Sequence, residues 1–482
     1  MLRKVLLIAL LTLLIIFYNV VPSTMDIAAM VILLGVAIFS TILFFTNKEK
    51  QEYLKGQFLK HSNIVILGLL IVHFQLYLDY ILGNISKYEN FIWANQKAVV
   101  KSMTLSTIGL ISFYLGYLYF KKPKKVKIKN SNETKYSVKI LTYAAALVLA
   151  IYFYTVNPLY LAGLYGSEDM GMIATYMALL FYLLIFAIII QSTRNLRIEN
   201  KLPANLLEYL KLMNPFLVVI IGIYLLSVLI SGDRGPLISF GLSFGSGYFF
   251  VKRVKLSFKK GILLIVSGAF VFTFLGLVRS VDKKLSFTEK IQRSFDDDKV
   301  NYDNYREINS ILPQTKELAS SVRTLHHTVN YVPAKHDFLY GRFQFQQITT
   351  AIPFFNTFNN LIFDKLSYKY RGSGSFITWI IQGDNPTSGS GTTCIADFYF
   401  DFGVPGVIIG MFIFGYFIRM FEINMYGIEL PSLLLHTALI IYLSDALYIS
   451  RSPVLFELRS VVWVFLVLLI NKYIINNKIR LA

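Results

Sequence analysis

Long hydrophobic runs separated by short polar segments dominate this chain of 482 residues. A run of about 20 apolar residues is long enough for a helix to cross the roughly 30 Å hydrocarbon core of a membrane. We expect each run of this length to form one membrane-spanning helix. The runs cover residues 5–21, 26–45, 63–83, 98–120, 137–157, 171–191, 214–230, 236–251, 261–279, 398–419, 431–448 and 456–475. The pattern predicts an all-α polytopic membrane protein with about 12 transmembrane helices.

One long polar stretch, residues 280–394, interrupts the series between the ninth and tenth predicted helices. It is too long for a simple connector, and loops of this kind usually carry function. Inside it, Phe287–Asn304 and Glu317–Asn330 are typical of helices, and Leu339–Phe354 is apolar enough to lie back on the membrane helices. The chain therefore divides into residues 1–279 with nine helices, the loop domain 280–394, and residues 395–482 with three helices.

Basic residues set the orientation, because Lys and Arg in short loops resist translocation across the membrane. With both termini in the cytoplasm, the cluster Lys121-Lys122-Pro123-Lys124-Lys125 lies inside and the long loop lies on the extracytoplasmic side. The formal net charge of +19 is then mostly a topology signal, so we expect no nucleic-acid partner. With 55% hydrophobic and only 16% charged residues, the composition excludes a soluble protein.

The sequence Ser231-Gly232-Asp233-Arg234-Gly235-Pro236 places a charged pair in a turn between two hydrophobic runs. The predicted orientation puts this turn at the extracytoplasmic membrane face. Glycines on both sides allow a ligand to approach the backbone, and Pro236 fixes the start of a helix whose first amides favour an anion. The alternative is that Arg234 is an ordinary topology residue paired with Asp233.

A second motif precedes the tenth predicted helix. It runs from Gly383 to Thr393 (GDNPTSGSGTT) and continues from Ile395 to Gly406 (IADFYFDFGVPG). In this order, the two motifs resemble the Wzy-type O-antigen or capsular polysaccharide polymerases. A Glu often precedes the Tyr in such sequences, whereas this chain has Asp397-Phe398-Tyr399, which leaves the role of Asp397 open.

The resemblance implies an enzyme of the bacterial inner membrane. Such an enzyme transfers a growing chain on undecaprenyl pyrophosphate to the next lipid-linked oligosaccharide repeat unit, outside the membrane. Its expected partners are these substrates, membrane lipids and a chain-length regulator. No cofactor is implied.

Transfer from a lipid pyrophosphate needs cations on the leaving group, since negative charge grows there as the bond breaks. Arginine suits this task because its guanidinium donates paired hydrogen bonds to phosphate oxygens and keeps its charge. We rank Arg234 first, and the other candidates are Arg279, Arg323, Arg342, Arg371 and Arg451. For Arg323 and Arg342 the alternative is a residue that only solvates the loop.

The transfer also needs a base near the acceptor hydroxyl. His326 and His327 are the main candidates, with Asp233 in the same catalytic group, because imidazole titrates near the working pH. Arg323 lies one helical turn before them, so on a helix it shares a face with His326 or with His327. A surface or interhelical histidine is the alternative. Asp384 begins a loop of Gly, Ser and Thr suited to sugar hydroxyls, although flexible linkers have the same composition.

We predict no metal site, because adjacent histidines point apart on a helix. Two other functions stay open. An O-antigen ligase-like glycosyltransferase differs only in its acceptor. A flippase or transporter of the lipid-linked oligosaccharide is expected to carry charges near mid-membrane and to have related halves, whereas the charges here gather at the outer boundary.

Overall fold

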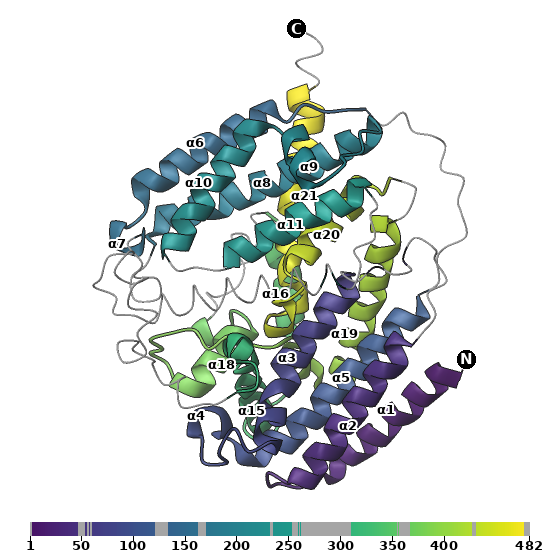
Figure 1. The fold of residues 1–482 in the computed structure, drawn as a ribbon. Coiled ribbons are helices and arrows are strands. Elements are labelled where there is room, and N and C mark those ends of the chain that lie inside the picture. The colour runs from purple at the N-terminus through teal and green to yellow at the C-terminus, as the bar shows by residue number, and fades with distance from the viewer. Residues whose placement is uncertain are drawn as a thin grey trace.

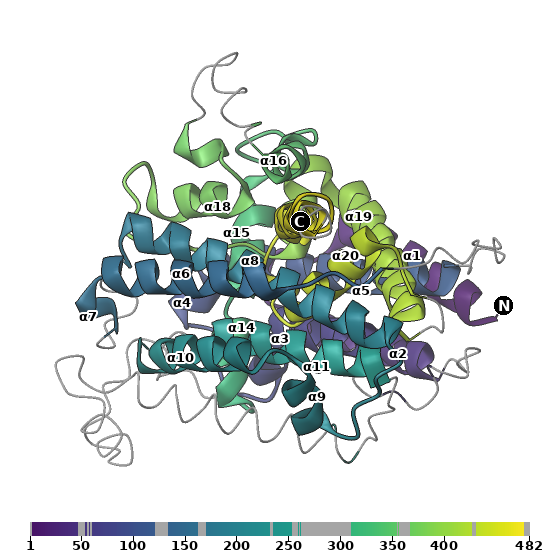
Figure 2. The same ribbon diagram turned by 90° about the horizontal axis from the view of Figure 1, so that it is seen from above.

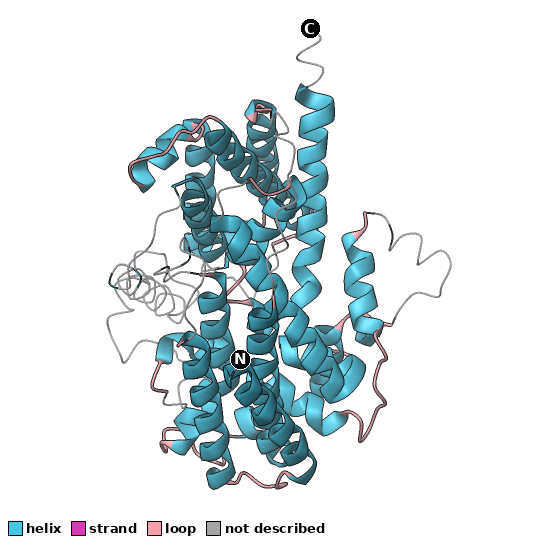
Figure 3. Ribbon diagram, turned by 90° about the vertical axis from the view of Figure 1, so that its right-hand side faces the viewer, coloured by secondary structure: helices cyan, strands magenta, loops and turns pink. Residues whose placement is uncertain are grey.

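The structure is a computed structural model in which every regular element of the described residues is a helix (Figure 3). It describes residues 2–46, 60–120, 134–161, 170–231, 235–252, 310–353, 367–426 and 430–476, and the single positions 54, 57, 259, 261 and 355. The all-α prediction is confirmed for this part of the chain.

Within the described ranges, 7 helices are long and apolar enough to cross a membrane, or up to 8 if the pair α9 and α10, bent by 112°, forms one span. Two further apolar helices, Lys139–Thr155 and Leu433–Ser444, are shorter. The predicted run 261–279 lies outside the described residues, apart from position 261. The membrane-protein class is therefore supported, and the count of 12 stays a prediction.

The N-terminal helices and one late helix form a first group (lower right in Figure 1). Its members are α1 (Leu2–Val20), α2 (Ile27–Phe45), α3 (His61–Ile81), α5 (Val99–Tyr119) and α19 (Cys394–Tyr426). α5 contacts each of the other four and is buried along most of its length. Glycines let α5 and α19 approach closely: a Cβ added at Gly116 would collide with the Phe412 carbonyl, and one at Gly415 with the Phe113 carbonyl.

A second group of helices occupies the other side of the molecule (upper left in Figure 1). Its members are α6 (Lys139–Thr155), α8 (Met172–Ile198), α10 (Pro215–Ser231), α11 (Gly235–Lys252), α20 (Leu433–Ser444) and α21 (Leu458–Ile470). α8 contacts α6, α11, α20 and α21, so it is the central helix of this group. The short elements that join the helices are α4 (Asn90–Trp93), η2 (Gln96–Ala98), α7 (Pro158–Leu161), α9 (Leu206–Leu212), η6 (Ile449–Arg451), η7 (Val454–Glu457) and the π-helical η8 (Asn471–Ile475).

α19 is broken near its start. Gly403 has φ 63°, a left-handed value that favours glycine, and Pro405 follows inside the helix. Proline has no N–H to offer the carbonyl of Asp401 four residues earlier. The backbone N–H of Tyr340 donates to that carbonyl instead (2.9 Å), and the N–H of Leu339 donates to Phe400 (2.9 Å). The chain just before α16 therefore supplies the hydrogen-bond donors that the carbonyls of Phe400 and Asp401 lack because the helix is broken.

The described part of the predicted loop domain lies at the end of the first group where α3 ends and α5 begins. Its elements are η4 (Pro313–Thr315), α14 (Lys316–Ala319), α15 (Val322–Tyr331), α16 (Arg342–Ala351), η5 (Tyr368–Tyr370) and α18 (Ser373–Gln382). Asp79, near the end of α3, accepts from Ser310 Oγ (2.6 Å) and from the N–H of Ile311 (2.8 Å). Seen from above, α16 and α18 lie along one edge (Figure 2).

Two predictions inside this segment are confirmed. The helix expected over Glu317–Asn330 is present as α14 and α15, interrupted at Ser320 and Ser321. Within the apolar stretch 339–354, residues Arg342–Ala351 form α16, which packs back on α19 and α21. The predicted helix Phe287–Asn304 lies outside the described residues, and the domain boundaries at 279 and 394 stay predictions.

Candidate functional site

One face of α15 carries three polar side chains that are each half-buried. Arg323, His327 and Asn330 recur at spacings of four and three residues, so they follow one side of the helix. His326 lies on another side and is 1% exposed. Because α15 packs against α4, η2 and α5, its polar face meets the chain that connects α3 to α5. The two neighbouring histidines therefore have different environments.

Both ring nitrogens of His326 are bonded inside the protein. Its Nδ1 lies 3.2 Å from the carbonyl of Ile92, which can only accept, so Nδ1 carries the proton. Nε2 then accepts from the hydroxyl of Tyr77 (2.8 Å). The ring stacks on Trp93 with a centroid distance of 5.7 Å. Burial lowers the pKa of His326 to about 3, so the ring is neutral at neutral pH and links α15 to α3 and α4.

His327 faces an amide pair. The side chain of Asn330 donates to Asn95 Oδ1 (2.9 Å), which turns the NH2 group of Asn95 toward His327 Nδ1 (2.9 Å). Nδ1 therefore accepts, and the neutral ring carries its proton on Nε2. Burial first, and the charge of Arg323 second, lower the pKa of His327 to about 4. The guanidinium carbon of Arg323 lies 3.9 Å from the centroid of the Phe91 ring.

A polar cavity of about 480 Å³ adjoins this face, and it shares Asn95 and Asn330 with it. Three segments line it: the turn between α1 and α2, the α4–η2 segment, and α15. The lining residues are Ser23, Thr24, Met25, Asn90, Trp93, Ala94, Asn95, Gln96, Lys97 and Asn330. Amides and hydroxyls that both donate and accept hydrogen bonds dominate this list, which suits a ligand rich in hydroxyl groups.

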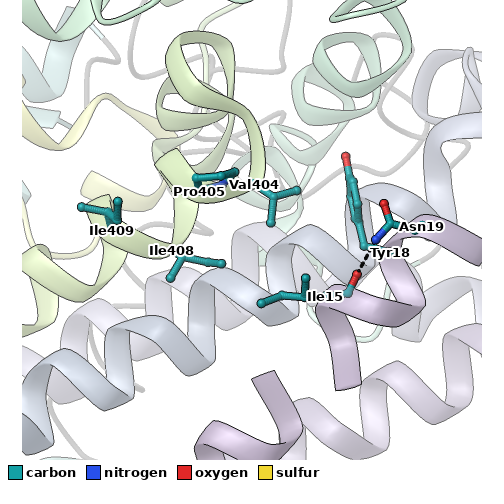
Figure 4. A pocket seen from close by; sticks show the side chains of 7 residues that line it. All are labelled: Ile15, Tyr18, Asn19, Val404, Pro405, Ile408 and Ile409. Atoms are coloured by element: carbon teal, nitrogen blue, oxygen red, sulfur yellow. Dashed lines mark hydrogen bonds between the residues drawn. The ribbon is translucent and has the colours of Figure 1, made fainter. Parts of the chain in front are cut away.

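A second cavity, about 460 Å³ and mostly apolar, lies between α1 and α19 (Figure 4). The lining residues are Ile15, Tyr18 and Asn19 of α1, and Val404, Pro405, Ile408 and Ile409 of α19. The α19 part of this groove begins directly after the break at Gly403. At its polar end, the hydroxyl of Tyr18 donates to that of Tyr399 (2.9 Å), which donates to the carbonyl of Val332 just beyond α15 (3.3 Å).

A family model described as O-antigen polysaccharide polymerase Wzy matches residues 1–478, which is nearly the whole chain. The chain belongs to this family. Comparison with curated proteins and with solved structures gave no match. Membership, together with the apolar helices, establishes a membrane-embedded protein with a polysaccharide polymerase role, and the resemblance drawn from the two sequence motifs is confirmed.

In this polymerase the second motif contributes a buried carboxylate. Asp397 is 0% exposed and accepts from Ser373 Oγ (2.5 Å), Gln344 Nε2 (2.6 Å) and Gln347 Nε2 (3.1 Å). One turn later, Asp401 accepts from the first free N–H groups of α16, at Phe343 (3.2 Å) and Gln344 (2.9 Å). The two acids therefore hold α16 and α18 against the start of α19. Sequence reasoning left Asp397 without a role and missed its partners, which lie in a different segment of the loop.

The remaining described candidates lie on other elements. Arg342, at the start of α16, stacks on Tyr370 with 4.1 Å from its guanidinium carbon to the ring centroid. Arg371 lies 6.0 Å from the Tyr368 ring. Asp384 accepts from the indole N–H of Trp379 (2.8 Å).

Arg451, on η6, lies 4.0 Å from Glu317 of α14. It therefore connects the hairpin before α21 to the start of the loop segment. Asp233, Arg234 and Arg279 lie outside the described residues. Gly235, the next described residue, begins α11, and the hydroxyl of Ser239 one turn later donates to Asp445 (3.3 Å).

Proposed function

We propose that this polymerase joins undecaprenyl-pyrophosphate-linked oligosaccharide repeat units at the extracytoplasmic face of the bacterial inner membrane. The acceptor hydroxyl attacks the anomeric carbon of the growing chain, the bond from that carbon to the pyrophosphate oxygen breaks, and carrier pyrophosphate leaves. Support comes from one observation above the others: a cation and an imidazole, Arg323 and His327, share one face of α15 beside a cavity lined by amides. No step requires a metal ion.

His327 takes the acceptor proton at Nδ1. In the structure this atom is occupied by the NH2 group of Asn95, which also lines the polar cavity. A sugar hydroxyl that enters the cavity can replace that amide as the donor to Nδ1, and it is then placed for proton transfer. His326 is less suited to the task because both of its nitrogens are bonded to protein groups in a buried position.

Arg323 binds the leaving pyrophosphate and adjusts the base. Its positive charge contributes to lowering the pKa of His327 to about 4, which makes a weak base. Negative phosphates that bind beside Arg323 oppose this effect and raise the pKa of His327 back toward its ordinary 6.5. The base is thus strengthened when substrate is bound. The proposal keeps three further residues on the basis of the sequence alone. These are Asp233 and Arg234, which belong to the first motif, and Arg279, which lies at the edge of the long loop.

The test is polymerisation by purified protein supplied with lipid-linked single repeat units in the presence of a chelator, with products resolved by length. His327→Ala should abolish the ladder of products because no other group accepts the proton at that place. His336→Ala is the matched control, since His336 lies in the same segment but lines neither cavity: its Nδ1 lies 2.7 Å from the carbonyl of Asp337 and its Nε2 lies 3.4 Å from the hydroxyl of Tyr370.

A full ladder from His327→Ala would remove His327 as the base, while leaving the family assignment untouched. Loss of the wild-type ladder in chelator would contradict metal independence. Transfer of a single preformed chain to a lipid A acceptor, without elongation, would favour the ligase-like alternative.

A further inference from the structure

The end of α1 separates the two cavities. The residues just before it, Ile15, Tyr18 and Asn19, face the apolar groove, and those just after it, Ser23 to Met25, face the polar cavity. Only Val20, Val21 and Pro22 stand between the two sets along the chain. An apolar surface and a surface lined by amides and hydroxyls therefore lie close together around the end of α1, and this region is named the docking corner.

Two lysines mark this corner. Lys97 of η2 lines the polar cavity. Lys101 follows one turn later, in α5, and its ammonium nitrogen lies 4.8 Å from the ring centroid of Tyr18, which lines the apolar groove. The two lysines are four residues apart, in the 3-10 helix η2 and at the start of α5, so their backbone positions lie about one turn apart and both long side chains can reach one pyrophosphate. No Asp or Glu is among the residues that line the two cavities, all of which belong to the described part of the chain.

We infer that this corner binds the lipid carrier of the acceptor unit: the groove between α1 and α19 holds its polyprenyl chain, Lys97 and Lys101 hold its pyrophosphate, and the polar cavity holds its sugars. The pyrophosphate that leaves the growing chain is the one bound by Arg323. This rests on the proposed function. The order of surfaces, apolar, cationic and then amide-lined, matches the order of groups along a polyprenyl-pyrophosphate-linked oligosaccharide. An ordinary phospholipid would fill the groove and place its single phosphate near the lysines, but it has no oligosaccharide to fill the polar cavity.

The break in α19 explains why the groove exists at this place. Gly403 and Pro405 interrupt the helix, and the groove residues Val404, Ile408 and Ile409 follow directly on it. Figure 4 shows their side chains opposite Ile15 and Tyr18 of α1. Three of the four α19 residues that line the groove are branched aliphatics, so the groove offers an isoprenoid chain no hydrogen-bonding group from that helix.

The corner also connects to the proposed catalytic face. Tyr18 reaches Val332, just beyond α15, through Tyr399. On the other side, the polar cavity contains Asn95, the amide bonded to His327. A sugar held next to the lysines therefore lies beside the residue that we propose as the base.

The first test measures binding of undecaprenyl pyrophosphate to the full chain in nanodiscs. The double variant Lys97→Ala, Lys101→Ala should bind at least about tenfold more weakly, since each charged hydrogen bond to phosphate contributes roughly that factor. Lys139→Ala, Lys211→Ala is the matched control, because it removes two exposed charges from residues that line neither cavity. Equal affinity in the Lys97 and Lys101 variant would overturn the pyrophosphate assignment.

The second test fills the groove. Ile15→Trp should weaken binding of undecaprenyl pyrophosphate but leave that of dimethylallyl pyrophosphate, which lacks the long chain, unchanged. Ile16→Trp is the control, since Ile16 is the next residue on α1, is 59% exposed and does not line the groove. Unchanged binding in Ile15→Trp would overturn the groove assignment.

Three further outcomes also test the inference. Competition by phosphatidylglycerol as strong as that by the carrier would show that the groove takes bulk lipid, and would overturn the inference. In a second outcome, wild-type protein polymerises lipid-linked units while the Lys97→Ala, Lys101→Ala variant and the Ile15→Trp variant bind the carrier normally. That result would contradict carrier binding at this corner and leave the proposed function intact. If wild-type protein binds no undecaprenyl pyrophosphate at all, the carrier named in the proposed function is itself wrong.

Discussion

At the scale of single residues, burial and partners separate side chains that look equivalent in sequence. His326 and His327 are adjacent and of the same type, yet one is bonded to Tyr77 and Ile92 in the interior and the other to an amide at the wall of a cavity. The sequence predicts the pair, and the shared face with Arg323 follows from helical spacing. Which of the two faces the cavity depends on contacts with α3 and α4, far away along the chain.

The two histidines make stability depend on pH. Their pKa values in the folded protein are about 3 and about 4, below the ordinary 6.5, so the unfolded chain binds more protons at mildly acidic pH. The stabilisation from keeping them neutral is fully present above pH 6.5 and is lost progressively as the pH falls toward 4 and 3. The melting temperature of wild type, measured relative to that of a variant without one of the two rings, should therefore fall steadily between pH 6.5 and 5.

The variant His326→Asn should show a smaller fall across that range than wild type, while His336→Asn should show the same fall. Cys394 is the only cysteine and is buried, so a thiol-reactive dye reports unfolding directly. An equal slope in wild type and His326→Asn would contradict the assignment of this pH dependence to His326.

The Arg234 prediction belongs to the same scale. Arg234→Lys should lose most polymer while the protein still inserts, because Lys keeps the charge but loses the planar pair of hydrogen bonds. The cost of such a missing donor set against developing charge is about 3 kcal/mol, or about a hundredfold in rate. Polymer length and protein level in the variant strain are the measurements. Normal polymer at a normal protein level would return Arg234 to the role of a topology residue.

At the scale of elements, the hydrophobic runs locate the helices well but say little about their neighbours. The predicted run 98–120 corresponds to α5 (Val99–Tyr119), because an uninterrupted apolar run has few other ways to satisfy its backbone in a membrane. The predicted run 398–419 is shorter than α19, which also includes the polar start at Cys394 and the break at Gly403. The break could not be predicted in full, since it requires Leu339 and Tyr340 to supply the missing donors.

The contact between α5 and α19 can be tested by a single methyl group. Gly116→Ala places a Cβ against the backbone carbonyl of Phe412, where no flexible side chain can move away. Overpacking of this kind costs about 1–3 kcal/mol, so the melting temperature should fall markedly. Gly222→Ala is the matched control, because nothing lies within 4 Å of its added Cβ. Equal melting temperatures for the two variants would mean that α5 and α19 are not in contact at this place.

At the scale of the whole molecule, the site is assembled from segments that are distant in sequence. The α1–α2 turn, the connection from α3 to α5, and α15 form one cavity, and α1 and α19 form the other. The succession of hydrophobic runs predicts an all-α membrane protein and the order of its helices, and the two motifs predict the family. The sequence cannot show that Asn95, which lines a cavity together with Lys97, bonds to His327, because that contact arises only when α15 packs back on the first helices.

The last prediction concerns the orientation of the whole chain. Lys335, beyond α15, and Lys201, between α8 and α9, are both exposed, and the basic-residue pattern places them on opposite sides of the membrane. In a Cys394→Ser background, Lys335→Cys should react with a membrane-impermeant maleimide in intact spheroplasts. Lys201→Cys should react only after the membrane is permeabilised.

Two local contacts agree with this assignment. Lys201 and Lys135 both pair with Glu199, so the end of α8 and the chain before α6 lie together, as expected for two segments on the same side. Labelling of both positions from outside would mean that the helix count between α8 and α15 is wrong. Labelling with the two sides exchanged would place Arg323, His327 and both cavities at the cytoplasmic face, where lipid-linked units are not expected to be polymerised.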